Sequence, residues 1–300
     1  MRNARKREKI SRLIIIGLLV IAGINSCKPD NKFTDSKAER PRNIILMIGD
    51  GMGVAHVYAG LTANGGHLNL ESCQYVGFQK THSASSYITD SGASGTAMAT
   101  GKKTFNGAIA VDTSGNSVKT ILEMAEDEGL STGLVATSTI THATPASFVA
   151  HNPDRGKYEE IAQDFIGAGI EVIIGGGRYH FNKREDGLDL LEQLKEDGYL
   201  VTDQIERVDH GHQGPIAVFT DSLSMPPALK GRGDLLPRAT ELAIESGHME
   251  SGEVAGIFGT DGHTGVMVPV FAYGPGAEKF AGIYENTDIF KKMASLLDLE

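Results

Sequence analysis

Short apolar runs alternate with segments of helical spacing along most of this chain. Asn43 to Ile48 is an apolar run that ends on a glycine-rich turn, which is typical of a buried strand. Comparable runs predict further strands over Tyr75 to Lys80, Gly133 to Ala136, Glu171 to Ile174 and Val268 to Tyr273. Each run is short enough for a strand that is covered on both faces.

Helices are expected between these strands. One begins near Gly53, and Val118 to Glu128 carries an apolar stripe. Others are expected over Ser91 to Thr100, Glu159 to Ile166, Leu188 to Leu194 and Asp288 to Leu297. The repeated strand-then-helix order predicts an α/β fold with a mainly parallel sheet and helices on both faces. In such sheets ligands bind at the carboxyl ends of the strands.

Composition adds a limit on size. The chain has 300 residues, of which 40% are hydrophobic and 22% charged, as in an ordinary globular protein. That length suits one large domain or two small ones, and the regular alternation favours one α/β domain. We found no internal repeat that would suggest a different organisation.

The N-terminus is typical of an export signal. Residues 1–12 are rich in arginine and lysine, and Leu13 to Gly23 is an apolar run too short to span a bilayer comfortably. Ile24 to Cys27 is a loose match to the lipobox of bacterial lipoproteins. We therefore expect a signal peptide over 1–26, a tether over 27–40 and the folded domain over 41–300. The periplasm or cell envelope is the expected location, with a lipid on Cys27 as the membrane anchor. An uncleaved anchor or plain signal cleavage are the alternatives, and both also export the chain.

Cysteine content and charge exclude some classes of protein. If Cys27 carries a lipid, only Cys73 remains, and a monomer has no internal disulfide. The formal charge of −10 becomes more negative once the basic signal is removed. Such an acidic surface argues against nucleic acid as a partner. A phosphate ester would have to be attracted locally, by metal ions, an arginine or a helix N-terminus.

Two polar residues stand where glycines let a ligand approach the backbone. Asp50 lies between Gly49 and Gly51 at the end of the first expected strand, so its carboxylate can face a crevice that a cation enters. An ordinary turn aspartate is the alternative. Ser91 follows Asp90 at the start of an expected helix, where the helix dipole favours an anion, although an ordinary N-cap is the alternative. As a nucleophile, the hydroxyl would need a base or a metal.

Later segments add further candidates. Pro145 is placed to start a helix, which would fix His142 and Thr144 just before it. The guanidinium of Arg155 matches two phosphate oxygens. His263 comes shortly before the last expected strand. Taken alone, each residue has an alternative. His142 also suits a capped or core histidine, Arg155 a solvated arginine and His263 a loop histidine.

Together these motifs resemble the alkaline phosphatase family. The segments that carry the resemblance are Met47 to Gly53, Asp90 to Gly101, Thr141 to Arg155 and His263 to Ala277. The resemblance implies that Ser91 is the phosphorylated nucleophile and that Arg155 grips the phosphate. It also implies that Asp50 contacts two metal sites, that His142 and Thr144 help to bind a magnesium-type metal, and that His263 ligates a catalytic zinc. Zinc and magnesium are thus the implied cofactors, and a homodimer is a candidate assembly.

The same resemblance implies ligands that this chain lacks. The family needs a further glutamate, an Asp-x-x-x-His pair and an Asp-His pair before the strand that matches Val268 to Tyr273. In this chain only Ser246 to Met267 lies between the helix that matches Leu236 to Glu245 and that strand. One parallel crossover takes about thirty residues. Asp209 and His210 form an Asp-His pair, but at a place where the family has a variable connection, so a solvated loop is expected there. An internal deletion near Glu245 to Ser251 is therefore expected. It is either a natural deletion or an error in the assignment of the gene's coding sequence.

Two functions follow from these residues. The first is exported phosphomonoester hydrolysis through a phosphoserine at a zinc and magnesium site. The second is a shortened pseudoenzyme that binds phosphate or metal without turnover, because each zinc site has one identifiable protein ligand and zinc prefers three or four. Related phosphate and sulfate ester hydrolases share the fold, but Asp90 and Ser91 favour the phosphatase.

Overall fold

The computed structural model describes residues 40–209, 211–246 and 263–299. The expected signal peptide, Cys27 and nearly all of the expected tether lie outside these residues. Most of the segment from Ser246 to Met267, where the deletion is expected, also lies outside them. Within the described ranges no helix has the length and apolar character that a membrane span requires.

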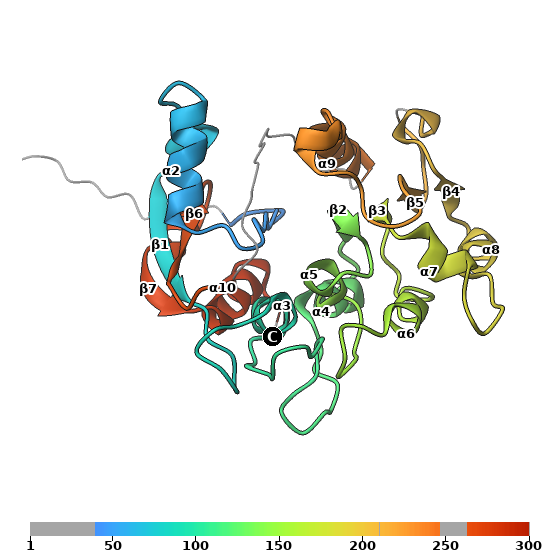
Figure 1. The fold of residues 1–300 in the computed structure, drawn as a ribbon, viewed down its shortest axis with the longest axis horizontal. Coiled ribbons are helices and arrows are strands. Elements are labelled where there is room, and N and C mark those ends of the chain that lie inside the picture. The colour runs from blue at the N-terminus through green and yellow to red at the C-terminus, as the bar shows by residue number, and fades with distance from the viewer. Residues whose placement is uncertain (1–39, 210, 247–262, 300) are drawn as a thin grey trace, which may run out of the picture. The chain divides into compact units, whose positions relative to one another are not determined.

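A four-stranded parallel sheet forms one part of the fold (Figure 1). Its strands lie in the order β2 (Gly133–Thr139), β3 (Val172–Gly176), β5 (Ile216–Phe219) and β4 (Leu200–Thr202). The pattern had predicted β2 and β3 but not β4 and β5, which have only three and four residues. This sheet and its helices confirm the predicted α/β fold class.

Alternate side chains of the parallel sheet pack on opposite faces, as the two-residue period of a strand requires. Ile173 packs in one apolar cluster with residues of several helices, and Val172 packs in a second cluster with residues of another helix. Helices α6 (Tyr158–Gln163) and α8 (Leu190–Glu196) contribute to the first cluster, and α9 (Leu235–Ser246) contributes to the second. Each fully buried isoleucine in these clusters contributes about 2 kcal/mol relative to an exposed one. Helices therefore cover both faces.

A second sheet has the strand order β6 (Val268–Ala272), β1 (Tyr75–Lys80) and β7 (Gly282–Glu285). Strands β1 and β7 are parallel, whereas β1 and β6 are antiparallel. Val268 to Tyr273 had been predicted as the last strand; β7 follows it, so that expectation was wrong. Because β7 is short and holds one glycine at its start, its pattern is weak.

The strand expected over Asn43 to Ile48 is absent, which corrects the prediction. These residues form no regular structure, and Ile45 and Met47 are each 45% exposed. An apolar run becomes a strand only when a neighbouring strand satisfies its N–H and C=O groups. No ladder of the described residues includes this run.

Helix boundaries follow from caps. Helix α4 (Ile121–Asp127) begins three residues after the expected start, because the Thr120 hydroxyl accepts from the Glu123 N–H at 3.1 Å and Glu123 accepts from the Thr120 N–H at 2.7 Å. The remaining helices are α2 (Val54–Ala63), α3 (Ser91–Thr100), α5 (Ala143–Ala146), α7 (Arg178–Asn182) and α10 (Thr287–Leu297). Short 3-10 turns are η2 (Asn69–Ser72), η3 (Ile205–Arg207), η4 (Ala228–Lys230) and η5 (Ala277–Phe280).

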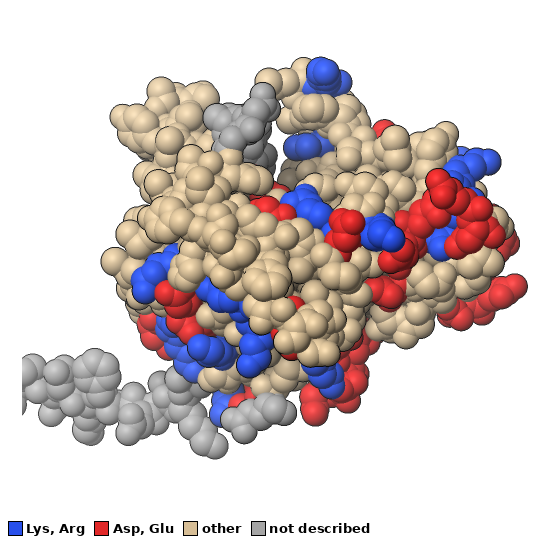
Figure 2. Space-filling view, turned by 60° about the horizontal axis from the view of Figure 1, so that its bottom comes forward, with Lys and Arg blue, Asp and Glu red and all other residues tan. Residues whose placement is uncertain are grey.

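Charged side chains are unevenly distributed on the face drawn in Figure 2. Lysine and arginine gather at the lower left, and acidic side chains gather at the right. Several of the lysines are paired: Lys80 contacts Glu285 at 3.0 Å and Lys291 contacts Asp288 at 2.6 Å. Such exposed pairs contribute about 0–1 kcal/mol each, so they do not determine the fold.

Candidate functional site

Ser91 is the first residue of α3, where several N–H groups are not used by the helix. The preceding Asp90 caps this helix, because its carboxylate accepts from the Ala93 N–H at 2.9 Å. Helix α3 is almost wholly buried beyond its first residue, so the position of Ser91 is set by a packed element. The Ser91 hydroxyl therefore stands at the positive end of a fixed helix.

Asp50 reaches Ser91 from a tight turn. The Met52 N–H donates to the Gly49 carbonyl at 3.0 Å, and Gly51 adopts φ +70, a conformation that favours glycine. The turn exposes the Asp50 carboxylate, which accepts from the Ser91 hydroxyl at 2.9 Å. The two residues that the sequence singled out first are thus in direct contact.

Thr144 joins the same carboxylate from a third segment. It lies in α5, which begins just after the carboxyl end of β2, and its hydroxyl donates to Asp50 at 3.1 Å. His142 is the residue that precedes this helix. We had expected Pro145 to start this helix and Thr144 to precede it. Helix α5 instead begins at Ala143, so Thr144 and Pro145 lie inside it and only His142 precedes it.

Arg155 bridges the site. One guanidinium nitrogen donates to Asp90 at 2.9 Å, and the other contacts Nε2 of His142 at 3.2 Å. Burial, and then the charge of Arg155, lowers the pKa of His142, so its neutral ring accepts from Arg155. Burial raises the pKa of Asp90, but hydrogen bonds from Ala93, Arg155 and Gly107 outweigh it and keep the pKa below its ordinary value. Asp90 is thus a carboxylate that holds both the helix cap and the arginine.

His263 differs from the other predicted residues. It is exposed, and within the described ranges no hydrogen bond or ion pair connects it to Asp50, Ser91 or Arg155. Its neighbours at 261 and 262 lie outside these ranges. The described ranges also contain no group of three or more His, Cys, Asp or Glu side chains that could hold a metal ion. The structure therefore brings together five predicted residues, and within the described ranges it shows no hydrogen bond or ion pair between them and His263.

Sequence reasoning missed the second role of Asp90. We interpreted it as a possible cap, but its contact with Arg155 spans 65 positions in the chain. The Gly107 N–H also donates to Asp90, at 3.0 Å. No spacing in the sequence indicates such a contact, because it depends on how two loops pack.

Comparisons with known proteins identify one family. The sequence profile of the alkaline phosphatase family matches residues 41–225 and 237–299. Alkaline phosphatase 4 of Bacillus subtilis is 37% identical over 242 residues, which are 73% of this chain and 52% of that protein. Alkaline phosphatase 3 of the same organism is 38% identical over 195 residues, which are 60% of this chain and 42% of that protein. The chain spans about half the length of the curated relatives it matches.

A solved structure supports the same assignment. The alkaline phosphatase of the Antarctic bacterium TAB5 is 30% identical and superposes with a TM-score of 0.79, covering 87% of this chain and 99% of that one. A variant of that enzyme was solved with magnesium bound in its M3 site. The family profile, the relatives and the fold coincide with the predicted motifs. The chain therefore belongs to the alkaline phosphatase family.

Proposed function

We propose that this chain hydrolyses phosphate monoesters through a phosphoserine on Ser91. The observation that supports this most directly is the contact of the Ser91 hydroxyl with Asp50 at the N-terminus of α3. A serine in that position has an acceptor for its proton on one side and N–H groups for an anion on the other.

Each residue has a defined part in this reaction. The Ser91 oxygen attacks phosphorus, its proton passes to the Asp50 carboxylate, and the bond from phosphorus to the ester oxygen breaks. The leaving oxygen takes up a proton from solvent. Water then attacks phosphorus and loses a proton to solvent, the bond from phosphorus to the Ser91 oxygen breaks, and this oxygen takes its proton back from Asp50 as phosphate is released. The Arg155 fork holds two oxygens of the phosphoryl group throughout, and its contact with Asp90 keeps it oriented.

The described residues suit magnesium better than zinc. Asp50, Ser91 and Thr144 offer oxygen atoms only, and Mg²⁺ is commonly held by one or two carboxylates together with a substrate phosphate and water. Zinc prefers nitrogen and sulfur ligands, and among the described residues none joins Asp50 to form such a set. Asp50 and Thr144 would hold magnesium, which when bound polarises the phosphoryl oxygens.

Hydrolysis of an aryl phosphate by the purified full chain tests this function. We expect magnesium-dependent turnover that Ser91→Ala abolishes. Ser94→Ala is the matched control, because its hydroxyl lies on the same helix without a hydrogen bond to Asp50. Turnover that survives in Ser91→Ala, or that falls equally in both variants, would contradict a phosphoserine mechanism.

A second candidate is a pseudoenzyme that binds phosphate or metal without turnover. The lack of a metal-ligand cluster among the described residues favours it. Calorimetric titration with inorganic phosphate separates the two functions. A chain that binds phosphate through Arg155, and loses this binding in Arg155→Ala, but hydrolyses nothing would be the pseudoenzyme.

We also propose that the chain is exported and anchored by a lipid on Cys27. The basic residues and apolar run of residues 1–26 support this proposal. Metabolic labelling with a radioactive fatty acid is expected to label the chain and not its Cys27→Ser variant. Export of an unlabelled chain would contradict lipid attachment and favour plain signal cleavage or an uncleaved anchor.

A further inference from the structure

His151 lies four residues before Arg155 and faces hydrogen-bond acceptors on both ring nitrogens. Nδ1 contacts the Ala110 carbonyl at 2.9 Å, and Nε2 contacts a Glu123 carboxylate oxygen at 2.9 Å. A carbonyl can only accept, so Nδ1 carries a proton. Burial raises the pKa of Glu123, but hydrogen bonds from His151 and Thr120 lower it more, so this group is an ionised acceptor. Both nitrogens therefore carry protons, and the ring is an imidazolium.

The charged groups around this ring are acidic. Glu123 faces it from α4, and Asp164, at the end of α6, accepts from the His151 backbone N–H at 2.9 Å. The hydrogen bond to Glu123 raises the pKa of His151, burial opposes this, and the bond to Ala110 adds to the increase. The imidazolium thus persists above the pH at which an ordinary histidine loses its proton.

Ala110, whose carbonyl accepts from His151, has a strained backbone. Ala110 has φ 39, uncommon for a residue with a side chain, and it is fully buried. Its N–H donates to the Thr96 hydroxyl at 2.8 Å, and its carbonyl also accepts from Val118 at 2.9 Å. Such a conformation persists only where its surroundings hold it, and His151 supplies one of these contacts.

A short ribbon connects Ala110 to Arg155. Ile109 and Asn152 exchange two backbone hydrogen bonds, at 2.7 and 2.9 Å. The Arg155 N–H then donates to the Gly107 carbonyl at 2.8 Å, and the Gly107 N–H donates to Asp90. The ribbon thus consists of residues 107–110 paired with residues 151–155. His151 and Arg155 lie at the two ends of its second segment.

We propose that His151 is a positioning residue: as the imidazolium it fixes the ribbon that carries Arg155, and loss of its proton as the pH rises weakens the grip of Arg155 on phosphate. This proposal rests on the proposed function, in which Arg155 holds the phosphoryl group. The consequence is that inorganic phosphate, the product, would be released more readily as the pH rises.

The first test measures the affinity of the full chain for inorganic phosphate between pH 6 and 9.5. Because the neutral amide of His151→Gln cannot donate to both acceptors, we expect about tenfold weaker binding at pH 6, the size of one lost charged hydrogen bond. The variant should also lose the extra pH dependence of the wild type. His180→Gln is the matched control, a half-buried histidine outside the ribbon, and it should keep the wild-type pH profile. Equal pH profiles for wild type and His151→Gln would overturn the proposal.

A double-mutant cycle tests whether His151 acts through Arg155. In an Arg155→Lys background, His151→Gln should weaken phosphate binding far less than in the wild type, because the fork that it positions is gone. An unchanged loss in that background would mean that His151 acts on phosphate independently of Arg155, which the proposal does not allow.

A third measurement does not depend on phosphate. Amide hydrogen exchange at Arg155 should be faster in His151→Gln than in the wild type, whereas exchange at Ile173 in β3 should be unchanged. If no form of the chain binds phosphate, the proposed function fails, but this exchange still decides whether His151 holds the ribbon. Should the variant not fold, nitrogen-15 spectra of the wild-type ring decide: a neutral His151 ring below pH 6.5 would overturn the proposal.

Discussion

At the scale of single residues, Asp90 does more than its place in the sequence indicates. It caps α3, accepts from the Gly107 N–H and binds Arg155. The positions of one helix and two loop segments therefore depend on one carboxylate. Its neighbour Ser91 is positioned by the same cap. The alignment of the nucleophile and the arginine therefore depends on a residue that we do not expect to touch the substrate's reacting atoms.

Asp90→Ala is expected to reduce the free energy of unfolding by about 2–3 kcal/mol, because it removes a cap and leaves two donors without a partner. Asp189→Ala is the matched control: Asp189 caps α8 through the Leu191 and Glu192 N–H groups and has no ion pair in the described chain. It should cost only about 1 kcal/mol. Urea denaturation at neutral pH measures both, and equal losses would show that the additional contacts of Asp90 contribute nothing.

The pKa of His151 gives a pH-dependent contribution to stability. Because this pKa is raised on folding, the contribution is fully present below the ordinary pKa of about 6.5 and is lost as the pH rises through the raised value. We expect the difference in unfolding free energy between the wild type and His151→Gln to be larger at pH 6 than at pH 9.5. Urea denaturation across this range measures it, and a difference that grows with pH would contradict the imidazolium.

At the scale of elements, α3 and α5 approach closely because one residue lacks a side chain. A Cβ atom at Gly95 would lie 2.7 Å from the Ser147 hydroxyl oxygen and 2.9 Å from the Ser147 Cβ atom. Ser147 follows α5, the helix that carries Thr144. The distance between the Ser91 helix and the Thr144 segment is thus set by a glycine in the middle of a helix, where glycine would otherwise be unfavourable.

Gly95→Ala is therefore expected to destabilise the chain by about 1–3 kcal/mol through overpacking, although alanine is the better helix former. Gly60→Ala provides the control, because a Cβ atom there, in the middle of α2, meets only Leu68 at 3.8 Å. It should stabilise the chain by roughly 0.5–1 kcal/mol. Thermal unfolding of both variants gives the comparison; stabilisation by Gly95→Ala would mean that α3 and α5 can separate without cost.

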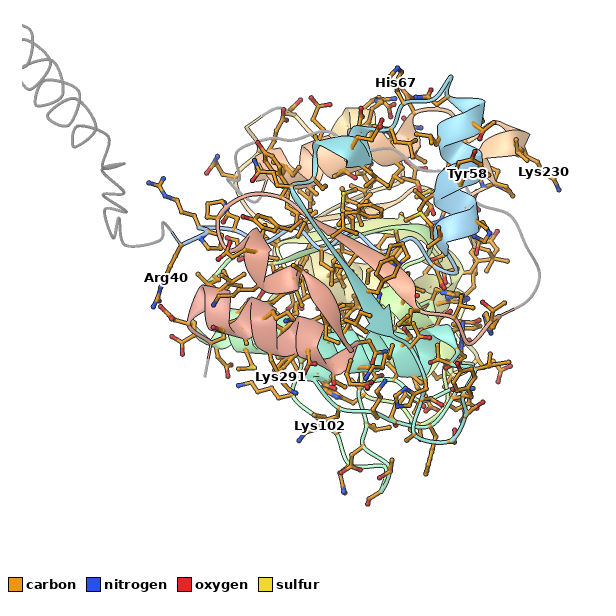
Figure 3. The ribbon with its side chains drawn as sticks, turned by 90° about the vertical axis from the view of Figure 1, so that its left-hand side faces the viewer. Arg40, Tyr58, His67, Lys102, Lys230 and Lys291 are labelled. Carbon is orange, nitrogen blue, oxygen red and sulfur yellow. The ribbon has the colours of Figure 1, made fainter. Side chains whose placement is uncertain are left out.

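At the scale of the whole molecule, the described residues leave one face of the β6–β1–β7 sheet partly uncovered. Tyr284 and Val270 face the cluster that contains α10. On the other face Val76 is 46% exposed and Ile283 63% exposed, and strand register places both with Phe78. Figure 3 is drawn from the side of this sheet and includes Tyr58 on α2, a helix without a buried residue.

We expect this uncovered face to associate with that of a second copy, since neighbouring apolar residues on an open sheet favour burial. Sedimentation velocity of the full chain, in detergent if the lipid is present, should show a dimer that Ile283→Lys reduces. Leu229→Lys is the control, because Leu229 is 90% exposed on η4, away from this sheet. A monomer at every concentration, or equal effects of the two variants, would exclude association through this face.

How much the sequence predicts depends on the range of the interactions. Helix α3, strands β1 and β3, and the α/β class were predicted because apolar period and caps are local signals. The strand over Asn43 to Ile48 was wrong because a strand also needs a neighbour, and short strands such as β5 have too few residues to show a period. The contact of Asp90 with Arg155 had no sequence signal.

The sequence by itself determined the family, the positions of Ser91 and Asp50 after their turns, and the type of chemistry that their side chains support. These follow from residue types in short motifs, where each neighbour acts within a few positions. The tertiary structure was needed to show that Asp50, Ser91 and Thr144 meet and that Asp90 holds Arg155. Those outcomes depend on the packing of segments distant in the chain, because hydrogen bonds and close contacts form only after the core has set the distances between them.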